Sequence, residues 1–176
     1  MSTSIVIRTV AETDLERLDD SYPEPGRPAS RHSERWDLQE HEEGVYLVAW
    51  RGDHPIGWVF VYRPGSHKAS KQAQHLDCAE VMDLHVDWRF RVQGHGSSLL
   101  AAAERLAQDA GWLLIGLEVT VSNPDNDVAR AMYERHGYYD SGLGVYESGY
   151  FYWTESGERR WDGEPHRFLI KSLIGS

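Results

Sequence analysis

Apolar runs along the chain alternate with segments of helical periodicity, and together they predict a mixed α/β domain. Strands are indicated by apolar or β-branched runs at residues 5–7, 45–50, 56–62, 78–86, 113–121, 138–154 and 166–174. Helices are indicated by capping residues and apolar spacing from residue 13 or 14, and over 30–43, 97–110 and 127–136. A proline-rich loop is expected at 22–29 and a polar connection at 155–165. The predicted order is β-α-α-β-β-β-α-β-α-β-β.

Alternation along two of these strands predicts which side chains share a face. In the strand 78–86 it predicts one face with Glu80, Met82, Leu84 and Val86, and another with Val81, Asp83 and His85. The strand 113–121 is mostly apolar, and this pattern predicts burial on both of its faces.

The composition indicates a single globular domain. The chain has 176 residues, 40% of them hydrophobic, which suits one domain over residues 1–176. Its net charge of −10 disfavours nucleic acid and anionic membranes, and it suits a cationic or amine-bearing partner. The single cysteine, Cys78, excludes an internal disulfide, and no apolar run approaches the roughly 20 residues of a membrane span. No signal-peptide pattern is present at the first residues, so we expect a cytoplasmic location.

Glycines stand where one predicted strand leads into the clearest helix. The segment that opens into this helix reads Arg91, Val92, Gln93, Gly94, His95, Gly96 and Ser97. Glycine lets the backbone approach a ligand closely, and a helix start offers unpaired N–H groups and a positive dipole end. The glycine segment therefore predicts a phosphate or pyrophosphate site. A Rossmann fingerprint is excluded because Leu99 stands at its third glycine position, and a Walker loop because Gly-Lys-Ser/Thr is absent.

The glycine segment and a second motif resemble the GNAT N-acetyltransferase superfamily. The hallmark of that family is Gln/Arg-x-x-Gly-x-Gly/Ala between a strand and a long helix, and Arg91 begins the matching segment here. The second motif runs from Asn126 through Tyr133 to Gly137. The resemblance covers residues 5–138. It implies a single-domain α/β GNAT fold, with a mixed central sheet of about seven strands flanked by about four helices.

The resemblance also implies acetyl-CoA, or another acyl-CoA, as the co-substrate. The backbone amides from Gln93 to Ser97 would bind the pyrophosphate, and Arg91 would add a charge at the rim. The strand edge at residues 84–86 would hydrogen-bond the pantetheine arm in the manner of an added strand. Asn126 would contact the same arm from the second motif.

Acyl transfer from a thioester to an amine needs a base for the amine and a proton for the departing thiolate. The family match implies Tyr133 as the general acid; its alternative is a helix tyrosine that packs against Ala129. Glu80 is the candidate base, at the spacing before the glycine segment that histone acetyltransferases of the family show. Its apolar neighbours predict a raised pKa, and its alternative is a carboxylate in solvent or in an ion pair. Asp83 and His85 are further candidate bases.

Acidic and aromatic residues gather in the regions that build the acceptor site in this family. They are Asp19, Asp20, Glu40, Glu42, Glu43, Glu147, Tyr150, Tyr152 and Trp153. Aromatic walls with carboxylates suit a cationic amine, so we expect a small-molecule amine acceptor. The alternatives are a peptide or protein amine, and a non-catalytic acyl-CoA-binding regulatory module. A homodimer is also open, and the histidine spacing predicts no metal site.

Overall fold

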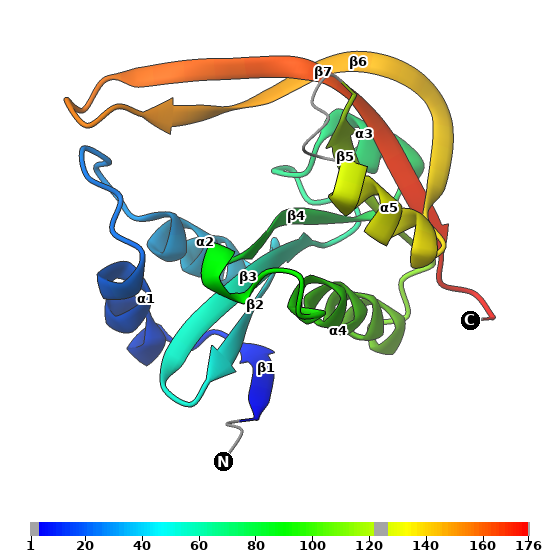
Figure 1. Ribbon diagram of the computed structural model, residues 1–176. Helices are drawn as coiled ribbons and strands as arrows, with labels where there is room; N and C mark the ends of the chain where they lie inside the picture. Colours follow the sequence, from blue (N-terminus) through cyan, green and yellow to red (C-terminus); the bar gives the residue numbers. More distant parts are fainter. Residues whose placement is uncertain (1–3, 122–126, 176) are drawn as a thin grey trace.

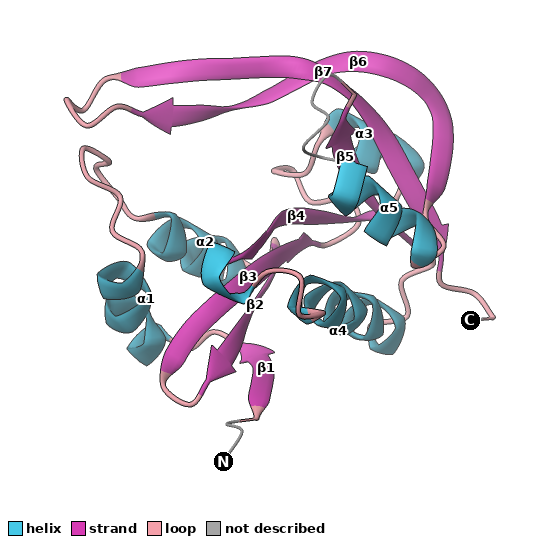
Figure 2. Cartoon of the chain, viewed as in Figure 1, coloured by secondary structure: helices cyan, strands magenta, loops and turns pink. Residues whose placement is uncertain are grey.

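The computed structural model describes residues 4–121 and 127–175, folded into one seven-stranded mixed sheet with helices on both faces (Figures 1 and 2). The sheet order is β1-β2-β3-β4-β5-β7-β6. The strands are β1 (Ile5–Thr9), β2 (Gly44–Arg51), β3 (His54–Tyr62), β4 (Ala79–Val86), β5 (Leu114–Thr120), β6 (Tyr139–Trp153) and β7 (Arg159–Ser172). The α-helices within the described ranges are α1 (Leu15–Ser21), α2 (Arg31–Glu40), α3 (Lys71–Leu76), α4 (His95–Asp109) and α5 (Asp127–Arg135). The predicted fold class and strand number are confirmed.

Helix α3 is the element that the hydrophobic pattern does not predict. It has 6 residues, and only one of them, Ala73, is buried, so no apolar period is visible. Capping defines it instead. The Ser70 hydroxyl accepts a hydrogen bond from the Ala73 N–H at 3.2 Å, and Asp77 ends the helix in the left-handed region at φ 50°.

Each face of the sheet has its own core. Helix α4 covers one face and buries Leu99, Leu100, Ala103 and Ala107 there. The other face lies beneath α1, α2 and α3, and its fully buried side chains include Leu18, Tyr46 and Phe60. Because apolar burial stabilises by about 25 cal/mol per Å², these two cores hold the sheet between its helices. No helix in the described part of the chain is long and apolar enough to cross a membrane.

Strands β4 and β5 are parallel neighbours for only a short distance. Their register has two pairs, Ala79 with Ile115 and Glu80 with Gly116. Beyond Glu80, β4 has no ladder partner on its β5 side among the described residues, and the two strands diverge (Figure 1). The divergence leaves a gap in the middle of the sheet and exposes one backbone edge of β4.

A β-bulge lies in the diverging part of β4. The pairing with β3 shifts between Phe60↔Met82 and Trp58↔His85, so two residues of β4 lie opposite one residue of β3. Asp83, one of those two, has a left-handed φ of 53°. A bulge of this kind inserts one extra residue and reverses the side-chain alternation beyond it.

The bulge makes the predicted alternation of β4 wrong. Met82 packs in the core beneath α1 and α2, whereas Leu84 packs in the core beneath α4. Asp83 bonds to an arginine of α2, and His85 stacks on a tryptophan of the same core as Met82. Asp83 and His85 therefore turn toward the face that Glu80 occupies.

The last two strands form a long hairpin, so the polar connection predicted at 155–165 is wrong. Strand β7 begins at Arg159, and only residues 154–158 make the turn. Residues 159–165, which are mostly polar, pair with β6 and are mostly exposed, where burial does not select for apolar side chains.

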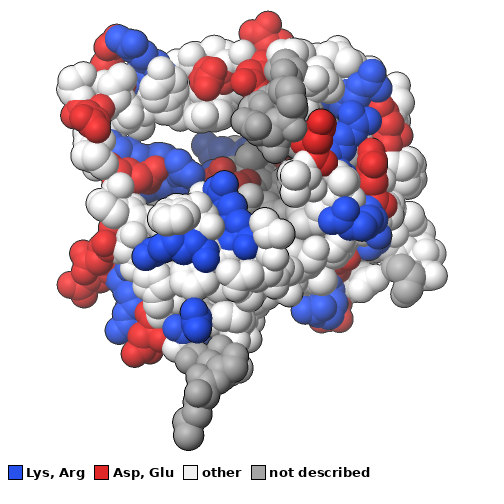
Figure 3. Space-filling view, in the orientation of Figure 1, with Lys and Arg blue, Asp and Glu red and all other residues white. Residues whose placement is uncertain are grey.

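The hairpin crosses the molecule as an arch and touches the loop between α1 and α2 with its tip (Figure 1). The contact is close at Gly26: a Cβ atom placed there would lie 2.2 Å from the backbone oxygen of Thr154. The space-filling view shows an opening beneath the arch, bordered by charged side chains of both signs (Figure 3). The arch therefore roofs the space next to the diverging strands.

Candidate active site

A cavity of about 450 Å³ lies at the divergence of β4 and β5. Its polar lining comes from four elements: β4, β5, α5 and the hairpin. The titratable residues that line it are Glu80, Asp83, Glu118, Tyr133, Tyr150 and His166. The two predicted catalytic residues, Glu80 of β4 and Tyr133 of α5, thus line one cavity.

Glu80 is fully buried at the last position where β4 pairs with β5. One carboxylate oxygen, Oε2, accepts a hydrogen bond from the Ser70 N–H at 2.7 Å. The other, Oε1, is buried with no hydrogen-bond partner among the described residues. Burial, assisted by the negative charge of Glu118, raises the pKa of Glu80 to about 7. A carboxylate with such a pKa and one free oxygen is suited to accept a proton near neutral pH.

Tyr133 lies on α5 and lines the cavity together with Ala129. Burial raises the pKa of its hydroxyl to about 12, so the group stays protonated at neutral pH. Its ring meets the ring of Tyr138 edge-on, with centroids 6.1 Å apart. The ring is held by packing, and the residue also lines the cavity. The packing interpretation and the catalytic interpretation of Tyr133 are therefore compatible.

The two further candidate bases are engaged elsewhere. Burial alone would raise the pKa of Asp83, but the Arg35 guanidinium overrides it and holds that pKa below its ordinary value. The Arg35 Nε donates to Asp83 Oδ2 at 3.1 Å. His85 stacks on Trp58, with ring centroids 4.4 Å apart, and burial lowers its pKa. An ion-paired carboxylate is a weak base, so the geometry favours Glu80.

Glu118 of β5 is a site residue that the sequence patterns did not single out. Its two carboxylate oxygens accept hydrogen bonds from the hairpin, one from the Tyr146 hydroxyl at 3.0 Å and one from the Ser148 hydroxyl at 2.7 Å. Glu118 therefore joins the hairpin to the cavity wall and places a second carboxylate near Glu80. The signal in the sequence was a charged residue within an otherwise apolar strand. The prediction that both faces of this strand are buried did not account for that residue.

The glycine segment forms the start of α4 as predicted. Gly94 has a φ of 85° and caps the helix without a side-chain hydrogen bond. The Ser98 N–H donates the first hydrogen bond within the helix, to the Gly94 carbonyl at 3.0 Å. The N–H groups of residues 95–97 come before it in the first turn, so they have no partner within the helix. A Cβ atom on Gly94 would meet nothing within 4 Å, which means that the loop opens toward solvent. The first turn of α4 is thus a cradle with free donors for an anionic group.

Gly96 and Arg91 connect this cradle to its surroundings. A Cβ atom on Gly96 would lie 3.4 Å from the sulfur of Met132, so α4 and α5 approach closely there. The Nε of Arg91 donates to the Val86 carbonyl at 2.9 Å, at the free end of β4. The backbone edge predicted for the pantetheine arm, residues 84–86, lies in the diverging part of β4 that β5 does not cover. Asn126 lies outside the described residues.

Comparison with known proteins agrees with this geometry. The sequence matches the acetyltransferase (GNAT) family over residues 13–138. The chain therefore belongs to the GNAT acetyltransferase family. A search of curated protein sequences finds no match.

Solved structures show the same fold at low sequence identity. An N-acetyltransferase from Staphylococcus aureus Mu50 aligns with a TM-score of 0.64 at 15% identity, covering 97% of this chain and 99% of the other. The ribosomal-protein-S18-alanine N-acetyltransferase of Escherichia coli gives a TM-score of 0.64 at 17% identity, covering 98% and 96%. The Salmonella typhimurium protein yncA, whose structure contains its cofactor acetyl-CoA, gives 0.65 at 12% identity, covering 98% and 96%.

Glu80→Gln is expected to raise the free energy of unfolding above neutral pH. The pKa of Glu80 rises from 4.5 to about 7 on folding, so between these values the folded state keeps a proton that the unfolded state loses. Wild-type stability therefore falls as the pH rises through this window, by up to about 3 kcal/mol for a shift of this size. The neutral amide of Glu80→Gln removes this loss of stability with rising pH. Urea unfolding at about pH 5 and about pH 8 measures the free energy of unfolding of each variant, with Glu147→Gln at an exposed position as control. Parallel pH dependence in wild type and Glu80→Gln would contradict the assignment.

Val92→Gly is expected to stabilise the protein. Val92 has a φ of 58° and a fully exposed side chain, so its β-branched group is strained and makes no compensating contact with the core. Removing left-handed strain gains about 1–2 kcal/mol, and the added freedom of glycine in the unfolded chain returns part of it. We expect a net increase of about 1 kcal/mol in the free energy of unfolding. Thermal unfolding measures this increase, with Val92→Ala, which keeps a Cβ atom, as the comparison variant. A decrease in the stability of Val92→Gly would contradict backbone strain at this position.

Proposed function

We propose that the protein transfers an acetyl group from acetyl-CoA to a primary amine of a small molecule, directly within a ternary complex. The observation that carries the proposal is the pairing of Glu80 and Tyr133 across one cavity, with pKa values of about 7 and about 12. One group is a proton acceptor near neutral pH and the other remains a proton donor. A protein that only binds an acyl-CoA needs neither.

The residues at the start of α4 fit the co-substrate. Acetyl-CoA, when bound, supplies the acetyl group as a thioester. The open side of Gly94 and the free first-turn N–H groups would hold its pyrophosphate, since both offer donors without a competing side chain. The uncovered edge of β4 would hold the amide-bearing arm by backbone hydrogen bonds, which leads it toward the cavity.

Glu80 would take the proton that the attacking amine must lose. An alkylammonium has a pKa of about 10.4, so at neutral pH almost none of it is the nucleophilic neutral amine. The free Oε1 of Glu80 is the acceptor, directly or through one water molecule. Glu118, with its carboxylate held by two hydroxyl groups, adds negative charge that attracts an ammonium to the same cavity.

Tyr133 would donate a proton to the sulfur atom as the carbon–sulfur bond breaks. Its burial keeps the hydroxyl neutral, and a neutral phenol can protonate a departing thiolate. The proton from the amine ends on Glu80 and the proton for the thiol comes from Tyr133, so the two side chains exchange protons with solvent between turnovers.

A small acceptor is supported by the cavity and by the arch. A volume of about 450 Å³ is in the range of small-molecule sites. The hairpin tip meets the α1–α2 loop at Gly26, so the opening beneath the arch is closed on that side and disfavours a folded protein surface. The single chain supplies both candidate catalytic groups, and the proposal needs no second subunit.

Gly94→Asp is expected to weaken acetyl-CoA binding at least about tenfold, because it places a negative charge where the pyrophosphate would lie. Calorimetric titration with acetyl-CoA measures the change. Gly65→Asp is the matched control: Gly65 also has a positive φ, 74°, with nothing within 4 Å of an added Cβ. Equal affinity in wild type and Gly94→Asp would remove the glycine segment from the binding site.

Glu80→Gln and Tyr133→Phe are expected to reduce acetylation in different ways. Wild-type kcat/KM should rise with pH to a plateau above about 7, because Glu80 must be ionised to act as base. Glu80→Gln should lose this limb, and each variant should lower kcat by about 10²-fold or more. Tyr133→Phe should keep the limb.

Thiol release from acetyl-CoA with a panel of amines measures these rates. Tyr139→Phe is the control for Tyr133, since Tyr139 is exposed and lies outside the cavity lining. Full turnover in Tyr133→Phe would remove its role as acid, and an unchanged pH profile in Glu80→Gln would remove its role as base.

A further inference from the structure

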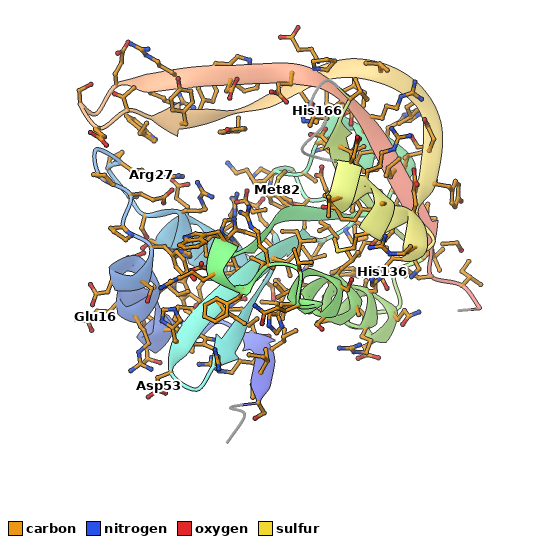
Figure 4. The ribbon with its side chains drawn as sticks, viewed as in Figure 1. Glu16, Arg27, Asp53, Met82, His136 and His166 are labelled. Atoms are coloured by element: carbon orange, nitrogen blue, oxygen red, sulfur yellow. The ribbon has the colours of Figure 1, made fainter. Side chains whose placement is uncertain are left out.

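A second cavity lies beneath the arch, beside the first. Its volume is about 270 Å³, and Tyr150 of β6 lines both cavities. The hairpin forms one wall with residues 150–153, of which Tyr150 and Tyr152 share one face of β6, with ring centroids 6.5 Å apart. The opposite wall comes from the α1–α2 loop and the start of α2, with Arg27 and Arg31 (Figure 4 labels Arg27). A molecule with its amine at Glu80 would extend past Tyr150 into this second cavity.

Arg31 is a positive group that lines the second cavity, where Tyr150 is the residue shared with the first. Burial pushes the pKa values of Asp83 on β4 and Tyr150 on β6 upward, and the charge of Arg31 pushes both downward. Its field therefore acts on both sides of the opening. The Arg31 side chain is 35% exposed, so it is accessible from the second cavity.

The arginines of the second cavity share one carboxylate. Glu24 Oε1 accepts from Arg31 Nη2 at 2.9 Å and from Arg27 Nη1 at 3.3 Å. Arg27 has a second acidic partner, Glu34, whereas Arg31 shares Glu24. Two carboxylates, Glu24 and Glu155, line this cavity together with the two arginines. The ion pair of Arg31 with Glu24 uses Nη2, and the remaining N–H groups of this guanidinium are donors for an additional anion.

We propose that the acceptor carries an anionic group, a carboxylate or a phosphate, which Arg31 binds in the second cavity while the amine lies near Glu80. This inference rests on the proposed function, and it narrows the acceptor to an amine with an acid at its far end. The aromatic wall of the hairpin would pack against the segment between the two groups. Among the residues that the structure describes, the lining of the first cavity has three carboxylates and no arginine or lysine, whereas the lining of the second has two carboxylates and two arginines. The amine of a zwitterion would therefore be drawn to the first cavity, with its acid left to Arg31.

The test uses ω-amino carboxylates of increasing chain length, their neutral primary amides, and the corresponding ω-aminoalkyl phosphates. Wild-type enzyme should prefer an acid to its amide at one intermediate length by about tenfold or more in kcat/KM, as a charge-assisted hydrogen bond would give. The better of carboxylate and phosphate identifies the anion. Arg31→Gln should abolish the preference by lowering kcat/KM on the acids to the level seen with the amides, and Arg31→Lys should restore part of it.

Arg17→Gln is the matched control, because Arg17 lies on α1 and pairs with Asp53 outside both cavities. Equal rates on acid and amide in wild type, or a preference that survives Arg31→Gln, would overturn the proposal.

A binding measurement separates this failure from failure of the proposed function. Calorimetric titration with the N-acetylated ω-amino carboxylates and their amides needs no turnover. The acid should bind more tightly than the amide to wild type and equally to Arg31→Gln, even if no amine is acetylated. Equal binding to wild type would overturn the anion site whatever the turnover assay shows.

Discussion

The divergence of β4 from β5 is the constraint on which the remaining features depend. Two parallel pairs hold the strands together, and beyond Glu80 each strand follows its own half of the sheet. That separation opens the cavity, uncovers the edge of β4 beside the start of α4, and lets α5 bring Tyr133 to the far wall. The last residue of β4 that pairs with β5 is itself the candidate base, so Glu80 is held by backbone pairing on both sides at the point where the gap begins.

The same arrangement has an energetic cost that the chemistry requires. A buried carboxylate with one unpartnered oxygen destabilises its ionised form, and this destabilisation moves its pKa close to neutrality. Glu118 adds to the effect and is held by hydroxyl groups of the hairpin. The hairpin therefore shapes the acceptor space and also positions a charge that influences the base. A site that carries such strain is expected to be less stable than its neutral variants.

Local signals made much of this structure predictable. The strand-to-helix glycine segment, the periodicity of α4, and the positions of Glu80 and Tyr133 all depend on short stretches of sequence. The exceptions depend on distant partners. The bulge at Asp83 is a mismatch between two strands, which one strand alone does not reveal. Glu118 and Arg31 acquire their surroundings from the hairpin and the α1–α2 loop, and the polar residues 159–165 are strand only because β6 pairs with them.

The close backbone contact at Gly26 makes the arch a closed ring rather than an open overhang. Any side chain at residue 26 would force the hairpin tip and the α1–α2 loop apart, because a Cβ atom there would overlap the Thr154 carbonyl. A single glycine thereby sets how closely two segments far apart in the sequence approach each other.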